Sequence, residues 1–429
     1  MTLSEFILLG SAATMAVLFL LVLFEPGLQY RVSAPGGALD AEPFVQLLGS
    51  IMNARIFRDS AIEPYTSGES IYAAQLEAIA AARSSVHLEA YLFLRGTAGA
   101  RFLAALTAAA QRGVKVRVIV DAIGSLITPS RYFEALRAAG GQVAWYQPVR
   151  WYTLKRFNNR THRELLVVDG RIGFVGGAGI ADYWLPTPGA GRPWRDTTVR
   201  VTGALVAGLQ TSFVENWLEA NGEILTGPEE FPLVRAHDPE ARNKGGVVGI
   251  VVNSTPSAGR ATRARMLFQL FLASARESIL VNSPYFVPDR SARAELIRAV
   301  KRGVRVSIVT PNRLNNHPVA RLASRRRYGE LIAAGVEIHE YQPAMIHAKV
   351  MVVDGAWTIL GSTNFDNRSF GLNDEVNVAL LDRALAARMA DQFAHDVAHS
   401  TRIDYEQWAR RPLGERLLAM LGIALERQE

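Results

Sequence analysis

The sequence predicts an α/β fold made of two homologous halves, whose mixed central sheets pack face to face about a pseudo-two-fold axis, behind an N-terminal transmembrane helix. Three observations support this prediction. Four segments recur in the same order roughly 190 residues apart, helical patterns alternate with short runs rich in Val and Ile, and a long apolar stretch lies near the N-terminus. Alternating helical and strand patterns are typical of sheets covered by helices.

The apolar stretch is long enough for a membrane-spanning helix. Residues 6–24 hold no charged side chain, and about 19 residues cross the ~30 Å hydrocarbon core as a helix. A cleaved signal peptide is the alternative, with residues 32–34 as a loose cleavage site. Residues 1–5 lack the basic side chains with which such peptides begin, and Pro35 follows the site directly. We therefore expect a retained anchor.

The distribution of charge predicts on which side of the membrane the protein lies and which class of partner it binds. Arg31, Arg55 and Arg58 follow the apolar stretch and no basic side chain precedes it, so the positive-inside rule places the bulk of the chain on the cytoplasmic side. The net charge of +7 and the pI of about 9.7 favour polyanionic partners, either nucleic acid or an anionic membrane surface. The absence of cysteine excludes disulfides and thiolate metal sites.

The repeat divides the chain into two halves. The matching segments are 81–93 with 274–286, 112–120 with 302–310, 138–148 with 333–343, and 162–177 with 347–362. Loop insertions account for the unequal offsets, and the largest insertion lies within residues 149–160. The predicted organisation is an anchor and connector over 1–40, a first half over 41–240, a second half over 241–405 and an amphipathic tail over 406–429.

Local patterns predict the elements of each half. Apolar residues recur at helical spacing over 102–111, Gly113 ends this helix, and residues 114–120 have the composition of a strand. Residues 165–168 are continuously apolar, which is typical of a central strand covered on both faces. Two Asp-Gly pairs predict tight hairpin turns, Asp169-Gly170 and Asp354-Gly355.

A histidine stands at the matching position of each half, at His162 and His347. Side chains two residues apart on a strand share a face, so His347 and Lys349 point together. This pair suits a phosphodiester, because a lysine neutralises a non-bridging oxygen while a histidine acts on phosphorus or on the leaving oxygen. Asn364 adds a neutral donor, and the small residues before it allow close backbone approach. A lone strand histidine is usually structural, but the duplicated spacing favours a site.

The pattern His-x-Lys-x4-Asp-x6-Gly-Ser-x-Asn resembles the motif of the phospholipase D superfamily, and the chain is similar to the membrane-bound cardiolipin synthase branch. The similarity extends over nearly everything after Ser67. Further matches are Leu88–Tyr91, Asp121, Trp194–Asp196, Ser362–Phe370 and Asn373–Asn377. The resemblance implies two displacements through a phosphatidyl-histidine, in which the second histidine first protonates the departing alcohol and then deprotonates the incoming one. It implies no metal and no organic cofactor.

The resemblance also implies roles for individual residues. His162 is the expected nucleophile and His347 the expected acid and base. Each imidazole needs a carboxylate to fix its tautomer, and the matching positions are Asp196 and Glu375. Asp169 and Asp354 complete the two motifs and are candidate catalytic residues, although their odd spacing from the histidines favours a turn-organising role. The candidates for contact with the phosphate are Lys349, Glu164, Gly177, Ser362 and Asn364.

The first half departs from the family motif at two positions. Glu164 stands where lysine is expected, and Gly179 stands where asparagine is expected. Two like charges ~4 Å apart cost about 4 kcal/mol at an effective dielectric of ~20, and Arg163 points to the opposite face. Candidates for a compensating cation are Lys155, Arg156, Arg160, Arg195 and Arg368. The departures leave three alternatives: an active enzyme with a rewired first half, a slow enzyme with altered acceptor choice, or a binding protein on a retired catalytic fold. We expect an active enzyme.

The expected substrate is an anionic phospholipid of the membrane. Joining two phosphatidylglycerol molecules with release of glycerol would give cardiolipin. The alternatives are a phospholipase D-type hydrolase, a nuclease with the same paired motif, and a lipid-binding pseudoenzyme. We expect no nucleic acid partner, because the sequence shows neither a recognition helix nor an aromatic stacking ladder. Residues 411–427 and 151–156 are candidates for membrane contact, or else an ordinary packing helix and an exposed loop.

Overall fold

The computed structural model describes residues 2–23, 30–33, 36–148, 150–151, 158–186, 191–232, 246–256 and 261–411. The chain begins with α1 (Leu3–Leu23) and α2 (Glu42–Met52). The elements of the first half are β1 (Phe57–Ser67), α3 (Gly68–Ala81), β2 (Ser85–Ala90), α4 (Thr97–Gln111), β3 (Lys115–Asp121), η1 (Ser130–Phe133), α5 (Glu134–Ala138), β4 (Gln142–Tyr146), β5 (Glu164–Val168), β6 (Ile172–Gly176), η3 (Asp182–Trp184), β7 (Arg195–Gly203) and α6 (Val206–Asn221).

The second half repeats this alternation of helices and strands. Its elements are β8 (Val247–Ser254), α8 (Arg263–Ser274), β9 (Ser278–Asn282), β10 (Phe286–Val287), α9 (Arg290–Lys301), β11 (Arg305–Pro311), α10 (Pro318–Ala333), β12 (Glu337–Tyr341), β13 (Val350–Val353), β14 (Trp357–Gly361), β15 (Phe365–Asp366), α11 (Asn367–Gly371), β16 (Glu375–Leu381), α12 (Arg383–Ala398), β17 (Ser400–Arg402) and α13 (Tyr405–Ala409). The expected α/β class is confirmed.

The strand order repeats from one half to the other. The order β1-β7-β6-β5-β2-β3-β4 in the first half corresponds to β8-β16-β14-β13-β9-β11-β12 in the second, and β17 adds to the far edge. In both halves three strands run parallel and their neighbours pair antiparallel, so the sheet is mixed. The expectation of two separate sheets needs correction. Strands β1 and β8 pair with each other and join the halves into one continuous 15-stranded sheet.

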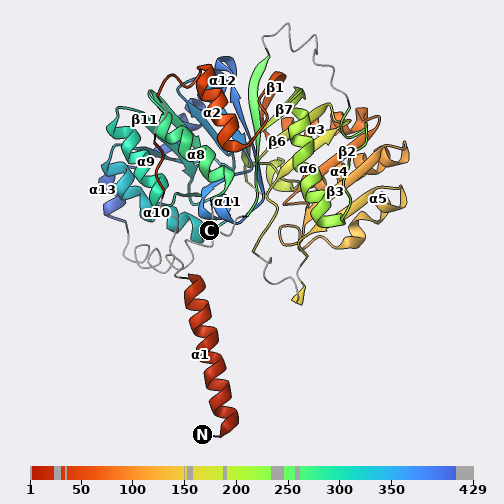
Figure 1. Ribbon diagram of the computed structural model, residues 1–429, viewed down its shortest axis with the longest axis horizontal. Helices are drawn as coiled ribbons and strands as arrows, with labels where there is room; N and C mark the ends of the chain where they lie inside the picture. Colours follow the sequence, from red (N-terminus) through yellow and green to blue (C-terminus); the bar gives the residue numbers. More distant parts are fainter. Residues whose placement is uncertain are drawn as a thin grey trace.

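The sheet curves so that both halves contribute to one shared core. Val175 of the first half and Val350 of the second belong to the same buried cluster, together with side chains of α6 and α12. The outer faces carry separate cores, beneath α3 and α4 in the first half and beneath α8, α9 and α10 in the second. Figure 1 shows the two halves side by side with their helices. Helix α2, which lies within the predicted first half, packs against α8 of the second half, where Phe44 contacts Phe271 edge-on.

The two predicted hairpin turns are confirmed. Asp169 and Gly170 have φ of 53° and 59°, and Asp354 and Gly355 have φ of 51° and 56°. Two consecutive positive φ angles match the right-handed twist of the flanking strands, and Asp-Gly tolerates them at low cost. The turns connect β5 to β6 and β13 to β14. They place the start of β5 and the start of β13 at equivalent points of the two halves.

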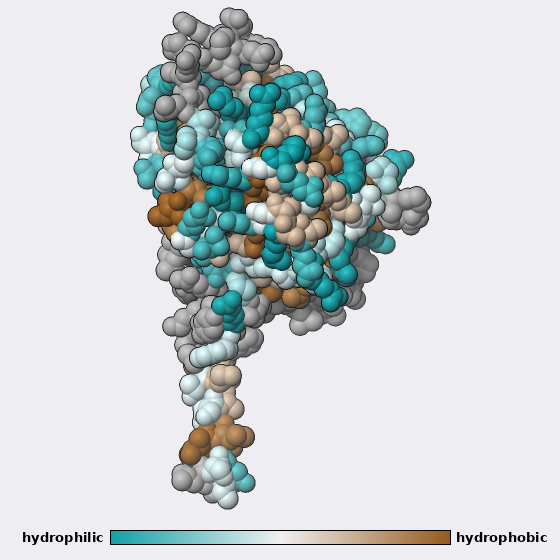
Figure 2. All heavy atoms as spheres, turned by 90° about the vertical axis from the view of Figure 1, so that its right-hand side faces the viewer, coloured by the Kyte–Doolittle hydropathy of each residue, from teal (hydrophilic) through white to brown (hydrophobic). Residues whose placement is uncertain are grey.

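The N-terminal apolar segment forms helix α1, which projects from the body in Figure 1. Figure 2 shows apolar side chains on this helix below a body whose visible face is mostly hydrophilic. Over the residues that the structure describes, no helix combines the length and apolarity that crossing a membrane requires. Of the predicted C-terminal tail, residues 412–429 lie outside the described residues, as do loop residues 152–157.

Candidate active site

The backbone of each motif is tied to the opposite half. His162 lies just before β5, and its amide donates to the carbonyl of Asp374 (2.9 Å). His347 lies just before β13, and its amide donates to the carbonyl of Arg195 (2.7 Å). Both imidazoles line one cavity of about 420 Å³ at the seam between the halves. The duplication therefore brings together two side chains that are 185 positions apart in the sequence.

Each histidine is oriented by a carboxylate from the other half. Nδ1–H of His347 donates to Oδ2 of Asp196 (2.8 Å), and Nδ1–H of His162 donates to Oε1 of Glu375 (3.1 Å). A carboxylate accepts only, so both imidazoles carry their proton on Nδ1 and leave Nε2 for the substrate. Both predicted orienting acids are thus in place. The crossed pairing means that neither half contains a complete histidine–carboxylate pair.

Two residues expected to contact substrate instead support the orienting acids. A β-carbon on Gly177 would lie 2.5 Å from Oδ1 of Asp196, so glycine allows this carboxylate its position. The hydroxyl of Ser362 donates to Glu375 and accepts from the amide of Val376 (3.1 Å). Gly177 and Ser362 are not among the residues that line the cavity. The structure thus places both residues against the orienting acids, and their contact with substrate stays a prediction.

Lys349 lies over the His347 ring, as the strand periodicity predicted. Its Nζ is 2.9 Å from Nδ1 and 3.1 Å from Nε2 of His347. Burial lowers the pKa of Lys349 to about 8, although nearby acidic side chains, Asp196 and Glu375 foremost, oppose the shift. The ammonium is consequently a poorly hydrated cation in a site of low dielectric, where its attraction for an anion is strong. Asn364 lines the same cavity, and its Oδ1 is buried without a hydrogen-bond partner in the described residues.

The environment of His347 favours the neutral ring in the free protein. Burial lowers its pKa to about 4, and the ammonium of Lys349 adds to this effect, while Asp196 opposes it. Burial tends to raise the pKa of Glu375, but His162 and hydrogen bonds from Ser362 and Ser369 together outweigh this and hold the pKa below its usual value. A bound anionic phosphate would raise the pKa of His347, because an opposite charge favours the protonated ring.

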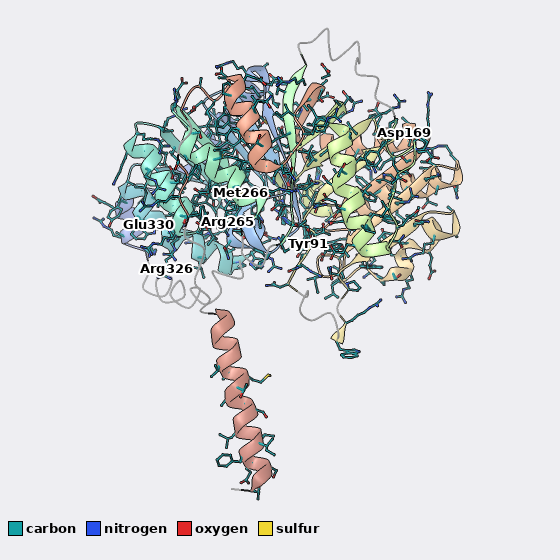
Figure 3. All side chains as sticks on the ribbon, viewed as in Figure 1. Tyr91, Asp169, Arg265, Met266, Arg326 and Glu330 are labelled. Atoms are coloured by element: carbon teal, nitrogen blue, oxygen red, sulfur yellow. The ribbon has the colours of Figure 1, made fainter. Side chains whose placement is uncertain are left out.

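Aromatic rings enclose the two histidines. Tyr91 meets His162 edge-on, with centroids 5.3 Å apart, and Trp184 and Trp194 lie 5.5 and 5.4 Å from His347. Figure 3 places Tyr91 near the boundary between the halves. Trp184 and Tyr285 also line the cavity and were not predicted from the sequence. Tyr285 belongs to the recurring segment 274–286 and could have been found from the repeat, whereas Trp184 has no such signal.

Two of the five candidate compensating cations line the cavity. Arg160 donates to the carbonyl of Gln147 (2.8 Å), and Arg368 donates to Oδ1 of Asn158 (2.8 Å). Arg195 is instead paired with buried Asp396 (2.9 Å) and is not among the lining residues. Lys155 and Arg156 lie outside the described residues. Arg163 points away from the cavity, as expected, and contacts Glu215 (3.2 Å).

Asp169 and Asp354 organise turns and do not reach the cavity. The Asp169 carboxylate accepts from the amides of residues 83–85, and the Asp354 carboxylate accepts from those of residues 276–278. Burial alone would raise the pKa of Asp169, but these amide donors outweigh it and the pKa is lowered. The candidate catalytic assignment of both residues is therefore corrected to a structural one, as their spacing indicated.

A duplicated α/β fold that brings two histidines, each oriented by a carboxylate of the other half, into one cavity defines a phospholipase D-like protein. The family model described as "Cardiolipin synthase, PLD-like domain" matches residues 76–183 and 269–397. The chain belongs to this cardiolipin synthase family.

Similar proteins extend over most of the chain. The cardiolipin synthase of Geobacillus thermodenitrificans is 36% identical over 359 residues, which cover 82% of this chain and 69% of the relative. Cardiolipin synthase A of Pseudomonas fluorescens is 34% identical over 404 residues, covering 94% and 80%. Among solved structures, a phosphatidylserine synthase from Haemophilus influenzae gives a TM-score of 0.70 at 14% identity, covering 90% of this chain and 100% of the other. That likeness supports the fold.

Proposed function

We propose that this protein is a phosphatidyltransferase that makes cardiolipin from two molecules of phosphatidylglycerol and releases glycerol. The crossed pairs of His162 with Glu375 and His347 with Asp196, which face one cavity, carry the proposal. Family membership supports the choice of reaction, because relatives that cover most of the chain are cardiolipin synthases.

The first step transfers the phosphatidyl group to the protein. Nε2 of His162 attacks phosphorus of the donor lipid, and the bond from phosphorus to the glycerol headgroup oxygen breaks. His347, protonated once the anionic phosphate is bound, gives its proton to that oxygen. Asn364 lines the cavity and the Lys349 ammonium lies against the His347 ring just behind the lining, so both stabilise the charge that develops on the non-bridging oxygens. The products of this step are free glycerol and a phosphatidyl-histidine.

The second step releases the product and restores the site. A headgroup hydroxyl of the second phosphatidylglycerol gives its proton to His347, and its oxygen attacks phosphorus while the bond to His162 breaks. The tryptophans and tyrosines around the histidines present apolar surface to the reacting atoms. Excluding water in this way favours transfer to an alcohol over hydrolysis.

A product assay tests this proposal. Detergent-solubilised full-length protein is incubated with labelled phosphatidylglycerol, and the lipids and the water-soluble products are separated. We expect cardiolipin and glycerol in equal amounts. Phosphatidic acid as the main product would instead establish a hydrolase. Failure to convert any of several phospholipids, with several alcohols as acceptors, would favour a lipid-binding protein.

We also propose that α1 attaches the enzyme to the membrane, with the body on the cytoplasmic side. Residues 6–24 carry no charge, and the side chains of α1 from Phe6 to Val17 are exposed. Two loops that contribute residues to the cavity lining also carry exposed apolar side chains. Leu126 and Ile127 are 70% and 67% exposed, and Leu314, in the equivalent loop of the second half, is 54% exposed. Arg31, Arg55 and Arg58 after the helix support the orientation.

Charge insertion into α1 tests this attachment. Each arginine at the centre of a membrane helix costs about 2.5–3.5 kcal/mol in insertion, so we expect Leu9→Arg with Val17→Arg to move the protein from the washed membrane fraction to the supernatant. Ile224→Arg, at an exposed apolar position of the body, is the matched control and should stay with the membrane. Recovery of the unaltered protein in the supernatant would contradict attachment. Proteolysis of inside-out but not right-side-out vesicles would support the orientation.

A further inference from the structure

The two departures of the first half from the family motif lie against each other. Glu164 begins β5, and Gly179 follows the paired strand β6. A β-carbon built on Gly179 would lie 2.9 Å from Oε1 of Glu164 and 3.0 Å from Cβ of Leu92. A side chain at position 179, such as Asn364 provides in the second half, has no room while Glu164 holds this position. The glycine and the glutamate are therefore parts of one local arrangement.

The carboxyl of Glu164 faces the cavity, and the residue is partly buried at the start of β5. Burial raises its pKa well above the usual value, although Lys349 and the backbone amides of Leu92 and Tyr91 favour the ionised form. The protonated carboxyl has one O–H donor, which an ionised carboxylate lacks. The predicted repulsion between an ionised Glu164 and a phosphate is thus removed by the proton.

We propose that Glu164 is a neutral carboxylic acid that donates a hydrogen bond to a non-bridging oxygen of the substrate phosphate, in the position that Lys349 holds in the second half. Glu164 and Lys349 each stand two residues after the histidine of their half, with Glu164 as the first residue of β5 and Lys349 immediately before the equivalent strand β13. They therefore approach a phosphate from its two sides. A cation on one side and a neutral donor on the other match the single negative charge of a phosphodiester.

This inference rests on the proposed function, because it requires a phosphodiester between the two histidines. The charge state of Glu164 also depends on its titratable neighbours. The groups that face it across the cavity or from adjoining elements are Lys349, Asp196, Tyr72, Tyr91, His162, His347, Arg160, Arg368 and Asp366. Lys349 favours an ionised Glu164, whereas Asp196 disfavours it, and their effects on the pKa partly cancel.

A substitution series separates a hydrogen-bond donor from a charge. Glu164→Gln keeps the shape and an N–H donor, so we expect kcat/KM for phosphatidylglycerol to fall only about threefold. Glu164→Ala removes the donor, and a lost hydrogen bond to a charged group corresponds to a fall of roughly 10- to 100-fold. Glu164→Lys should lose at least tenfold, because its ammonium would face the amides of Tyr91 and Leu92. Glu63→Gln, at an exposed glutamate of β1, is the matched control.

The charge state of Glu164 can be measured separately, by infrared spectroscopy. The infrared difference spectrum between the detergent-solubilised protein and Glu164→Gln should contain the C=O stretch of a protonated carboxylic acid at neutral pH. A carboxylate band in its place would overturn the proposal, even if the alanine variant failed to fold. The proposal would also be overturned by equal losses of activity in the glutamine and alanine variants, by full activity of the alanine variant, or by a gain of activity in the lysine variant.

Failure of the proposed function can be distinguished from failure of the role proposed for Glu164. If the unaltered protein hydrolyses a phospholipid and makes no cardiolipin, the same series is measured on that hydrolysis. Every phosphodiester presents the same non-bridging oxygens, so the order glutamine above alanine still tests the donor role of Glu164.

Discussion

Replacing His347 by alanine is expected to lower cardiolipin formation by on the order of 10⁴-fold, the upper range for general acid–base catalysis. The side chain is 7% exposed, lines the cavity and directs Nε2 toward the substrate while Nδ1–H donates to Asp196. Its loss leaves the departing glycerol oxygen without a proton and the incoming hydroxyl without a base. The measurement is the rate of cardiolipin formation, together with thermal unfolding by circular dichroism.

A donor with an activated leaving group tells the two histidines apart. A phosphatidyl ester of p-nitrophenol needs no protonation on departure, so His347→Ala should release one equivalent of nitrophenol and retain the lipid on the protein. His162→Ala should release none. The opposite pattern would exchange the roles of the two residues. His399→Ala, at an exposed position after α12, is the control and should keep the rate of the unaltered protein.

Replacing Asp196 by asparagine is expected to lower kcat by roughly 10³- to 10⁴-fold, as loss of an orienting aspartate does in related histidine chemistry. Asp196 accepts Nδ1–H of His347 at 2.8 Å. An asparagine amide can instead donate to Nδ1, which leaves the ring proton on Nε2 and prevents the ring from accepting a proton there. Asp196 also raises the pKa of His347 against the effect of burial, so its loss depletes the protonated form needed in the first step.

A control variant and the stability of Asp196→Asn make this prediction testable. Asp391→Asn alters an exposed carboxylate of α12 and should leave kcat unchanged. The unfolding temperature of Asp196→Asn should stay close to that of the unaltered protein, because the asparagine oxygen can still accept from the backbone N–H of Thr197 (2.7 Å) when its NH2 group faces His347. A kcat within tenfold of the original in a folded variant would show that Asp196 does not control the proton on His347.

Much of the fold was predictable because it follows from local patterns. The central strand at 165–168 and the Asp-Gly turns depend on nearby side chains and on φ preferences, and both appear as expected. The union of two sheets through β1 and β8 was not predictable, because it depends on edge strands from distant segments. The docking of α2 onto the second half is likewise a contact between segments far apart in sequence.

The candidate site likewise has features that the sequence predicted and features that only the structure shows. The same-face placement of His347 and Lys349 followed from the two-residue period of a strand. The roles of Ser362 and Gly177 did not follow from the sequence, because they depend on which carboxylate packs against them. Glu164 is the clearest case: the sequence shows a carboxyl where a cation is expected, and only the structure places that carboxyl against Gly179, in a setting that raises its pKa.

By itself, the sequence determined the α/β class, the duplication and the chemistry expected of the paired histidines, because each of these depends only on residue types and their spacing. The tertiary structure decided which carboxylate serves which histidine, since the crossed pairs form only when the halves close on each other. It also gave the direction in which the pKa of Glu164 is shifted, because a pKa depends on desolvation and neighbouring charges that no local pattern records.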